Sequence, residues 1–479
     1  MARAARRPRY GGTLRMELGA ASVTLDPRQW QSGTAEAALG EKLGALVFDR
    51  LVSLDNYGRF QPQLASSWSR DAEAKRWQFN LRAGVVFSDG SPVIPADVVA
   101  ALAPILPNGR QILAGANSIA IESASPMTDL LEELASGRYF IFRASPSGEL
   151  IGTGPFVVSQ WNASGTLQSR STFVANERAW SGRPFLDAIE IVFGVAPARQ
   201  LIDLQVGKAD LSELTPDLMQ RAEQARLRTW SSQPVELVAL VFDGASPAVQ
   251  DARLREALSV SIDRATMAGV LLQKQAEPAA ALLPGWLTGY AFLFHMETNP
   301  DRVRELRAAV AANAVSAAGP LRLGVEAAGD LSRLLAERVA VNARQAGFNL
   351  QVIGHAVSST ATSTNVAPDV RLICWRVSSL SPRAALDSLA AAAGLSETPA
   401  AALSADPGQL YRRERATLDS YFVIPLVYLP ESLALGSAVC DWMPSPWGEW
   451  HLETVWLDRP TGAAPQNSPA PAAPQGARP

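Results

Sequence analysis

The segment Leu321-Arg322-Leu323-Gly324-Val325 is a short apolar run of the kind that forms a buried strand. Apolar residues at helical spacing follow it and end before Gly347, namely Leu331, Leu334, Leu335 and Val339. A second apolar run extends from Phe348 to Ile353. Because two strands joined through a helix lie parallel in one sheet, this strand-helix-strand unit predicts an α/β fold.

Strands and helices also alternate on the N-terminal side of this unit. Residues 36–51 carry apolar side chains at near-helical spacing, which favours a helix, whereas residues 77–81 alternate apolar and polar as a half-buried strand does. Residues 237–242 predict a buried strand that crosses between two lobes. Residues 460–479 are rich in proline and predict an unstructured tail.

The bulk composition is that of a folded protein with more than one lobe. The chain has 479 residues, of which 47% are hydrophobic and 19% charged, so disorder is excluded for its body. A net charge of −3 is too small to argue for nucleic acid or an anionic membrane surface. No apolar run is long enough for a transmembrane helix. Arg3, Arg6 and Arg7 are followed by no apolar stretch, so we expect a signal peptide to be absent from this chain.

The chain carries few residues in the patterns that catalysis or metal binding require. His295, His355 and His451 lie far apart and at no ligand spacing, so we expect no metal site. There is no nucleophile elbow, phosphate loop or dinucleotide fingerprint, and we expect no cofactor and no enzymatic activity. Cys374 lies between Ile373 and Trp375, and Cys440 follows Val439 with Trp442 two residues further on, which favours free thiols over a disulfide between them.

Five segments carry family-like motifs in register, namely Gly11 to Arg15, Phe79 to Gly90, Gly152 to Phe156, Trp180 to Asp187 and Arg253 to Arg264. Together they establish a resemblance to the peptide/nickel-type solute-binding proteins of ABC importers, known as extracellular solute-binding proteins of family 5. It covers nearly the whole folded chain.

The resemblance implies an α/β fold of the two-lobed, periplasmic-binding-protein-like clamshell type (large cluster C), with a small extra domain in the first lobe. The first lobe would comprise 8–47, 152–237 and a return at 425–459, with the inserted small domain at 48–151, the second lobe at 238–424 and a disordered tail at 460–479. The implied protein is a periplasmic or extracytoplasmic monomer. It would capture a small organic or peptide ligand for ABC permease subunits in the membrane.

The ligand motif departs from that of the family's peptide binders. In those proteins a tryptophan is followed three residues later by an aspartate that holds the peptide's amino terminus. Here Trp375 is followed by Ser378 in that position, so a charge-assisted partner for an ammonium group is lost. Arg376 between them either favours an anionic ligand group or is a solvated loop residue.

The resemblance also suggests where other ligand contacts would lie. The further candidates are Ala20, Ser22, Trp30, Phe242, Asp243 and Trp286. Taken singly, Ser22 is explained as well by loop capping and Phe242 by core packing. Two other functions stay open: a sensor or scaffold with a degenerate cleft, and a hydrolase on an unrelated α/β fold.

Overall fold

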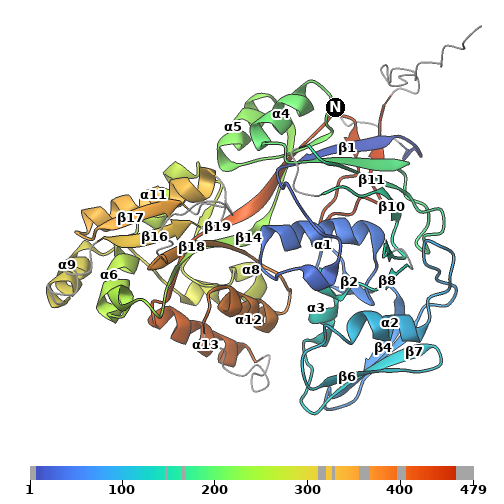
Figure 1. Cartoon of the computed structure of the whole chain (residues 1–479), viewed down its shortest axis with the longest axis horizontal. Helices are drawn as coiled ribbons and strands as arrows, with labels where there is room; N and C mark the ends of the chain where they lie inside the picture. Colours follow the sequence, from blue (N-terminus) through green and yellow to red (C-terminus); the bar gives the residue numbers. More distant parts are fainter. Residues whose placement is uncertain are drawn as a thin grey trace, which may run out of the picture.

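The computed structural model describes residues 7–145, 148–163, 168–310, 320–325, 330–354, 367–395 and 406–459. Predictions for residues 460–479 and for His355 lie outside these ranges. One large mixed sheet runs through the molecule, in the order β10-β11-β12-β1-β13-β19-β14-β18-β16-β17, with β15 paired to β19 (Figure 1).

The first lobe is built on one end of this sheet. Its strands are β1 (Thr13–Leu18), β10 (Phe156–Gln160), β11 (Arg170–Ala175), β12 (Ala188–Phe193) and β13 (Leu211–Glu213). Its helices are α1 (Ala35–Val47), α4 (Pro197–Gln205) and α5 (Pro216–Gln224). Inward residues of these strands, such as Met16 and Ile191, pack with Leu43 of α1 in one core.

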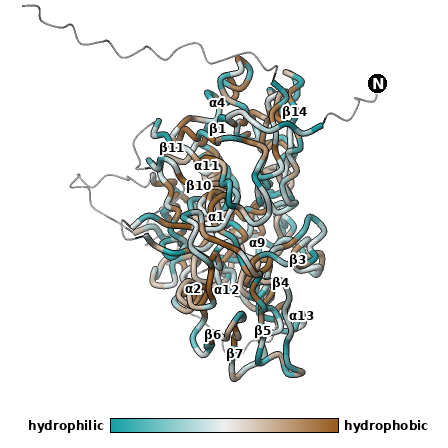
Figure 2. The backbone as a smooth tube through the Cα atoms, turned by 90° about the vertical axis from the view of Figure 1, so that its right-hand side faces the viewer, coloured by the Kyte–Doolittle hydropathy of each residue, from teal (hydrophilic) through white to brown (hydrophobic). Residues whose placement is uncertain are grey.

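A separate four-stranded antiparallel sheet, which we call the small sheet, lies beside this lobe. Its strands are β4 (Ala65–Arg70), β5 (Arg76–Leu81), β7 (Ser118–Ser123) and β6 (Arg110–Ala114), and it carries α2 (Pro95–Leu102) and α3 (Leu130–Leu134). Trp77, Phe79 and Val98 belong to a core distinct from that of the first lobe. Seen from the side, these strands occupy one end of the molecule and β1 and α4 the other (Figure 2).

The second lobe surrounds the other end of the large sheet. It contains β16 (Leu321–Val325), β17 (Leu350–Gly354), β18 (Val370–Arg376) and β15 (Glu277–Pro278). The helices around it are α6 (Ala252–Ser261), α7 (Arg264–Thr266), α8 (Gly285–Thr288), α9 (Pro300–Ala309), α11 (Asp330–Gln345), α12 (Pro382–Ala392) and α13 (Pro407–Asp419). Both faces of the sheet are buried, because Val238 and Leu240 enter one core and Leu237 and Ala239 the other.

Two long antiparallel strands connect the lobes: β14 (Arg228–Phe242) and β19 (Val423–Leu435). Their register is irregular between Ser231 and Glu236, where Pro234 lies opposite Pro430. Proline donates no ladder hydrogen bond, so the ladder is interrupted at this point; a further register shift lies between Val238 and Ala239. The register break therefore marks where the strands pass from one lobe to the other.

The sequence predictions hold for the element types and less well for their ends. The parallel register of β16 with β17 confirms the predicted strand-helix-strand unit. The helix predicted for 36–51 ends at Val47, because Phe48 is extended and Asp49 bridges to Ile141. The strand predicted for 237–242 begins at Arg228, since its polar first half pairs with residues 433–435 of β19.

Shorter elements complete the chain. They are β2 (Val52–Leu54), β3 (Phe60–Pro62), β8 (Arg143–Ala144), β9 (Leu150–Ile151), β20 (Val439–Cys440) and β21 (Trp456–Leu457). No helix in the described ranges is both long and apolar enough to cross a membrane. Cys374 and Cys440 are not joined by a disulfide bond.

Candidate functional site

Two adjoining cavities lie between the lobes. The first, called here the tryptophan cavity, encloses about 640 Å³ of empty space, open solvent included. It is lined by Glu41 of α1, Ala135 to Gly137, Trp286, Arg376 to Leu380 and Trp447 to Glu449. The second, the hinge cavity, encloses about 1360 Å³ on the same measure and is lined by Ala20, Glu213, Glu236, Pro430 to Ser432 and Trp450. Lys42, Val235 and Arg376 belong to the walls of both. Both lobes and the connecting strands thus contribute to one site.

A charge triad lies where the two cavities meet. Lys42 of α1 and Arg376 of β18 both bind the carboxylate of Glu431 on β19. Burial acts to raise the pKa of Glu431, but the two cations and their hydrogen bonds lower it to about 2. Burial lowers the pKa of Lys42 to about 8, with Glu431 opposing that effect. All three groups are therefore charged at neutral pH, and the triad ties the first lobe, the second lobe and a connecting strand together.

Arg50 holds a second ion pair in the wall of the tryptophan cavity. Its guanidinium binds Glu449 and donates to the carbonyl oxygen of Ala135, and the side chain is buried. Burial lowers the pKa of Arg50 to about 10, which keeps it positive at physiological pH. Arg50 therefore joins the α1 region to the C-terminal segment that carries Trp447.

Glu41, Glu213 and Glu236 are further carboxyl groups of the cavity walls. Glu213 accepts hydrogen bonds from the backbone N–H of Gly19 (2.6 Å) and from Gln200 (3.0 Å). Burial raises the pKa of each of the three carboxyl groups, that of Glu41 to about 7. They are partly desolvated acids in an interlobe space.

Four of the residues predicted from the sequence line these cavities. Ala20 lies in the wall of the hinge cavity, Trp286 and Ser378 line the tryptophan cavity, and Arg376 lines both. The Trp286 indole donates to the carbonyl oxygen of Pro234 at 2.7 Å, which fixes the ring beside the register break. Arg376 is not solvated, because it is bound to Glu431.

The other predicted residues do not line either cavity. Ser22 is exposed, and Trp30 packs edge-on against Phe140. Phe242 is buried in the core of the second lobe, and Asp243 accepts from the backbone N–H of Ala245 in a turn. Trp375 is buried under the first lobe: a Cβ built on Gly33 would lie 2.3 Å from its ring.

Sequence reasoning missed most of the charged residues of the site. Lys42 lies in the apolar stripe of α1, and Glu236 follows Val235 at the start of an apolar run. A charged residue within a predicted apolar face could have identified Lys42 and Glu236, because charged side chains are rarely buried unless they are paired. Glu431 and Glu449 carried no comparable signal. Within the described residues, no group of three or more His, Cys, Asp or Glu side chains could hold a metal ion.

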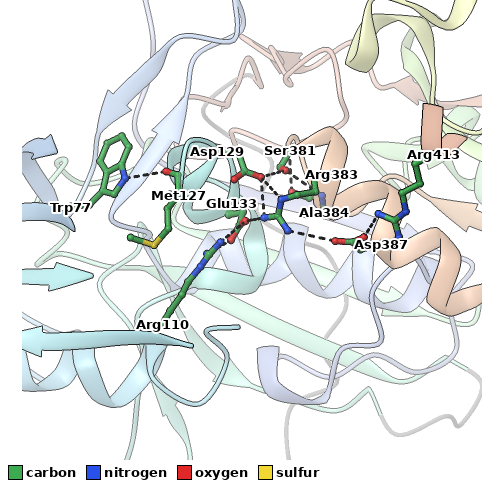
Figure 3. Close-up of polar contacts among 11 residues, drawn as sticks. Trp77, Arg110, Met127, Asp129, Glu133, Ser381, Arg383, Ala384, Asp387 and Arg413 are labelled. Atoms are coloured by element: carbon green, nitrogen blue, oxygen red, sulfur yellow. Dashed lines mark hydrogen bonds and ion pairs between the residues drawn. The ribbon is translucent and has the colours of Figure 1, made fainter. Parts of the chain in front are cut away.

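A second set of charges joins Asp129 and Glu133, at helix α3, to Ser381 and Arg383 of the second lobe (Figure 3). Arg383 of α12 donates through Nε to Asp129 Oδ2 at 3.0 Å and also binds Glu133 of α3. Ser381 donates to the same oxygen of Asp129 at 2.7 Å. We call these four residues the latch, because they connect the small sheet's helix to the second lobe.

The latch is anchored on both sides. Arg110 of β6 donates to Glu133 at 2.5 and 3.2 Å, and the Trp77 indole donates to the carbonyl oxygen of Met127 at 3.0 Å (Figure 3). In the second lobe, Asp387 lies 3.5 Å from Arg383 and binds Arg413 of α13. Glu133 is thus held from its own side by Arg110, whereas Ser381 and Arg383, which bind the Asp129 carboxylate, both come from the second lobe.

Comparison with known proteins gives the family. The model of the bacterial extracellular solute-binding proteins, family 5, matches residues 59–396. The nickel-binding periplasmic protein of Escherichia coli K12 is 26% identical over 355 residues, which are 66% of this chain and 67% of that protein. The peptide transport periplasmic protein SapA of Salmonella typhimurium is 23% identical over 329 residues, 59% of this chain and 58% of SapA. The chain spans about half (48%) of a further relative, protein XP55 of Streptomyces lividans.

Solved structures agree in fold over nearly the full length. NikA from Brucella suis in complex with Fe(III)-EDTA has a TM-score of 0.75 at 20% identity, covering 93% of this chain and 100% of its own. Haemophilus influenzae OppA, in complex with the peptide RPPGFSPFR, has a TM-score of 0.76 at 14% identity, covering 95% and 100%. The two-lobed α/β fold expected from the sequence is thereby confirmed. Since the family model spans well over half of the chain, the protein belongs to the bacterial extracellular solute-binding proteins of family 5.

Proposed function

We propose that the protein is the extracytoplasmic receptor of an ABC importer and encloses one small organic or peptide-like solute between its lobes. The observation that carries this proposal is the pair of adjoining cavities with walls from both lobes. Tryptophan faces and a few polar groups in such a space favour reversible binding of a small molecule. Rotation about the connecting strands at Pro234 and Pro430 would open the site to solvent.

The partners and the division of the chain are part of the same proposal. A monomeric receptor would deliver its solute to ABC permease subunits in the membrane. The lobes would comprise 8–47 with 152–237 and 425–459, and 238–424, with the small domain at 48–151. In support, the described part of 48–151 contributes most of a separate core.

The alternatives have less support. The relatives named above are binding or transport proteins by name, which favours a receptor over a hydrolase. A scaffold with a degenerate cleft would not need the charged and aromatic walls that both cavities retain. The replacement of the peptide binders' aspartate by Ser378 is explained instead by a different solute.

Mass spectrometry of the purified protein tests this function. Native spectra should show one bound solute per chain, released chemically unaltered on denaturation. Trp286→Ala should lose the solute, whereas Trp68→Ala, in β4 of the small sheet, should retain it. Conversion of the solute to a product, or retention by Trp286→Ala equal to that of the wild type, would contradict the receptor function.

A further inference from the structure

The interlobe cavities contain carboxyl groups without a contacting cation among the described residues. Glu41 lines the tryptophan cavity, and Glu213 and Glu236 line the hinge cavity. In the described ranges none of these three forms an ion pair. Glu36, also in the wall of the hinge cavity, is exposed to solvent. All three side chains are partly buried, and Glu213 accepts hydrogen bonds from Gly19 and Gln200. Carboxylates removed from bulk water are normally paired, so Glu41 and Glu236 in particular need an explanation.

The cations of the site are already occupied. Lys42 and Arg376 share the carboxylate of Glu431, and Arg50 binds Glu449. With the three carboxyl groups above, the partly or fully buried walls hold five carboxyl groups against three cations. The site is therefore acidic when all of its groups are ionised, and an anionic solute would find no unoccupied cation among them.

Tryptophan side chains give an independent indication of a ligand. Trp450 is 3% exposed and lines the hinge cavity, yet its indole N–H has no acceptor in the described part of the chain. Trp286 and Trp447 line the tryptophan cavity. Indole faces attract cations, and a buried indole N–H normally finds an acceptor. The ring of Trp450 already faces the Lys42 ammonium, 4.9 Å from the ring centroid, so its contribution to a ligand is the N–H group. A positive charge on the solute fits the rings of Trp286 and Trp447, and a hydrogen-bond acceptor fits the Trp450 N–H.

We propose that the solute is a small organic cation, whose positively charged groups are bound by Glu236 in the hinge cavity and by Glu41 in the adjoining tryptophan cavity. This inference rests on the receptor function proposed above and specifies its ligand class. The family's peptide binders use an aspartate three residues after the tryptophan, where this chain has Ser378. Here the countercharge comes instead from α1 and from the connecting strand β14.

The titration of Glu41 is consistent with this assignment. Burial raises the pKa of Glu41 to about 7, against the opposing charges of Arg50, Arg376, Lys42 and Arg138. A bound cation stabilises the ionised carboxylate, so binding near pH 6.5 should release protons from the protein. The affinity for a permanent cation should rise between pH 6 and pH 8.

A matched five-carbon series tests the charge of the solute. Cadaverine is a dication, pentane-1,5-diol is neutral and glutarate is a dianion. Each of the three is titrated into the protein by calorimetry at pH 7.5, and agmatine is titrated as a second cation. Cadaverine or agmatine should bind, and diol and glutarate should not. Glu236→Gln and Glu41→Gln should each weaken the cation about 30-fold. Glu223→Gln, an exposed change on α5, should leave the affinity unchanged. Two buffers of different ionisation enthalpy report the released protons.

Several results would overturn the inference. They are tighter binding of glutarate or diol, equal cadaverine affinity in wild type and both cavity variants, and no binding of either cation. Binding of NiCl₂ alone would also overturn it, because the ligand would then be a metal ion. In each case the receptor function stands if a solute co-purifies and is lost in Trp286→Ala. Absence of any such solute counts against the receptor function instead.

Discussion

Replacing Arg383 with glutamine should open the lobes. Arg383 is the cation that binds Asp129 and Glu133 across the interface, and the exposed fractions of the three side chains are only 12%, 10% and 3%. Removing one partner of a buried ion pair costs about 3–5 kcal/mol when the remaining charge stays buried. Glu133 keeps Arg110, and Asp129 keeps the hydroxyl of Ser381. When the lobes open, water hydrates the Asp129 carboxylate, so the cost in free energy of losing Arg383 is smaller than for a charge that stays buried.

The expected shift is therefore about 2 kcal/mol, or roughly 30-fold, toward the open arrangement. Small-angle X-ray scattering of the ligand-free protein should give a larger radius of gyration for Arg383→Gln than for the wild type. High salt should change the radius of gyration of the wild type only slightly. The latch is shielded from solvent, and salt screens buried ion pairs less than exposed ones.

A control and a double-mutant cycle make the reasoning refutable. Arg415 pairs with Asp419 on the same lobe but is 50% exposed, so Arg415→Gln should leave the scattering unchanged. In combination with Asp129→Asn, the effects of Arg383→Gln should be strongly non-additive. Wild-type scattering in Arg383→Gln, or strict additivity in the cycle, would show that the latch does not hold the lobes together.

Three further predictions concern the packing between the lobes and the charges of the cleft. Gly33→Ala should lower the free energy of unfolding by roughly 2 kcal/mol or more, because Gly33 has φ +86 and an added Cβ would meet Trp375. An unchanged melting temperature would contradict this packing. Glu41→Gln should stabilise the ligand-free protein at pH 8 but not at pH 4. A carboxyl group with a raised pKa destabilises the fold as pH rises from about 4.5 to about 7. Equal melting temperatures of variant and wild type at pH 8 would refute this prediction. Glu431→Gln should destabilise the protein at neutral pH, and this difference should vanish as pH falls from about 4.5 toward 2; a pH-independent difference would exclude the ion triad as its source.

Hydrophobic periodicity was enough to predict the local elements. The pattern of residues 321–353 predicts a parallel strand pair, and the register of β16 with β17 confirms it. Side-chain spacing of 2 or 3.6 residues is a local property, so it can be seen in a single segment. Ends were predicted less well, because capping and pairing set them: the polar residues 228–231 join β14 only through their partners in β19.

The family resemblance in turn predicted the two-lobed fold, whereas the residues it suggested for the site divide between the interlobe cavities and other surroundings. Trp286, Arg376 and Ser378 line the interlobe cavities, whereas Trp30 and Phe242 pack elsewhere. Aromatic residues serve cores and clefts alike, and sequence patterns do not distinguish the two uses.

The amino-acid sequence sufficed for the family, the α/β class and the order of strands and helices, since these follow from local periodicity and motifs. Only the tertiary structure determined which charges meet. Lys42 and Glu431 are 389 positions apart, and Arg383 and Asp129 are 254 apart. An ion pair depends on the distance and solvent exposure of two side chains in space, and both arise only when the lobes come together.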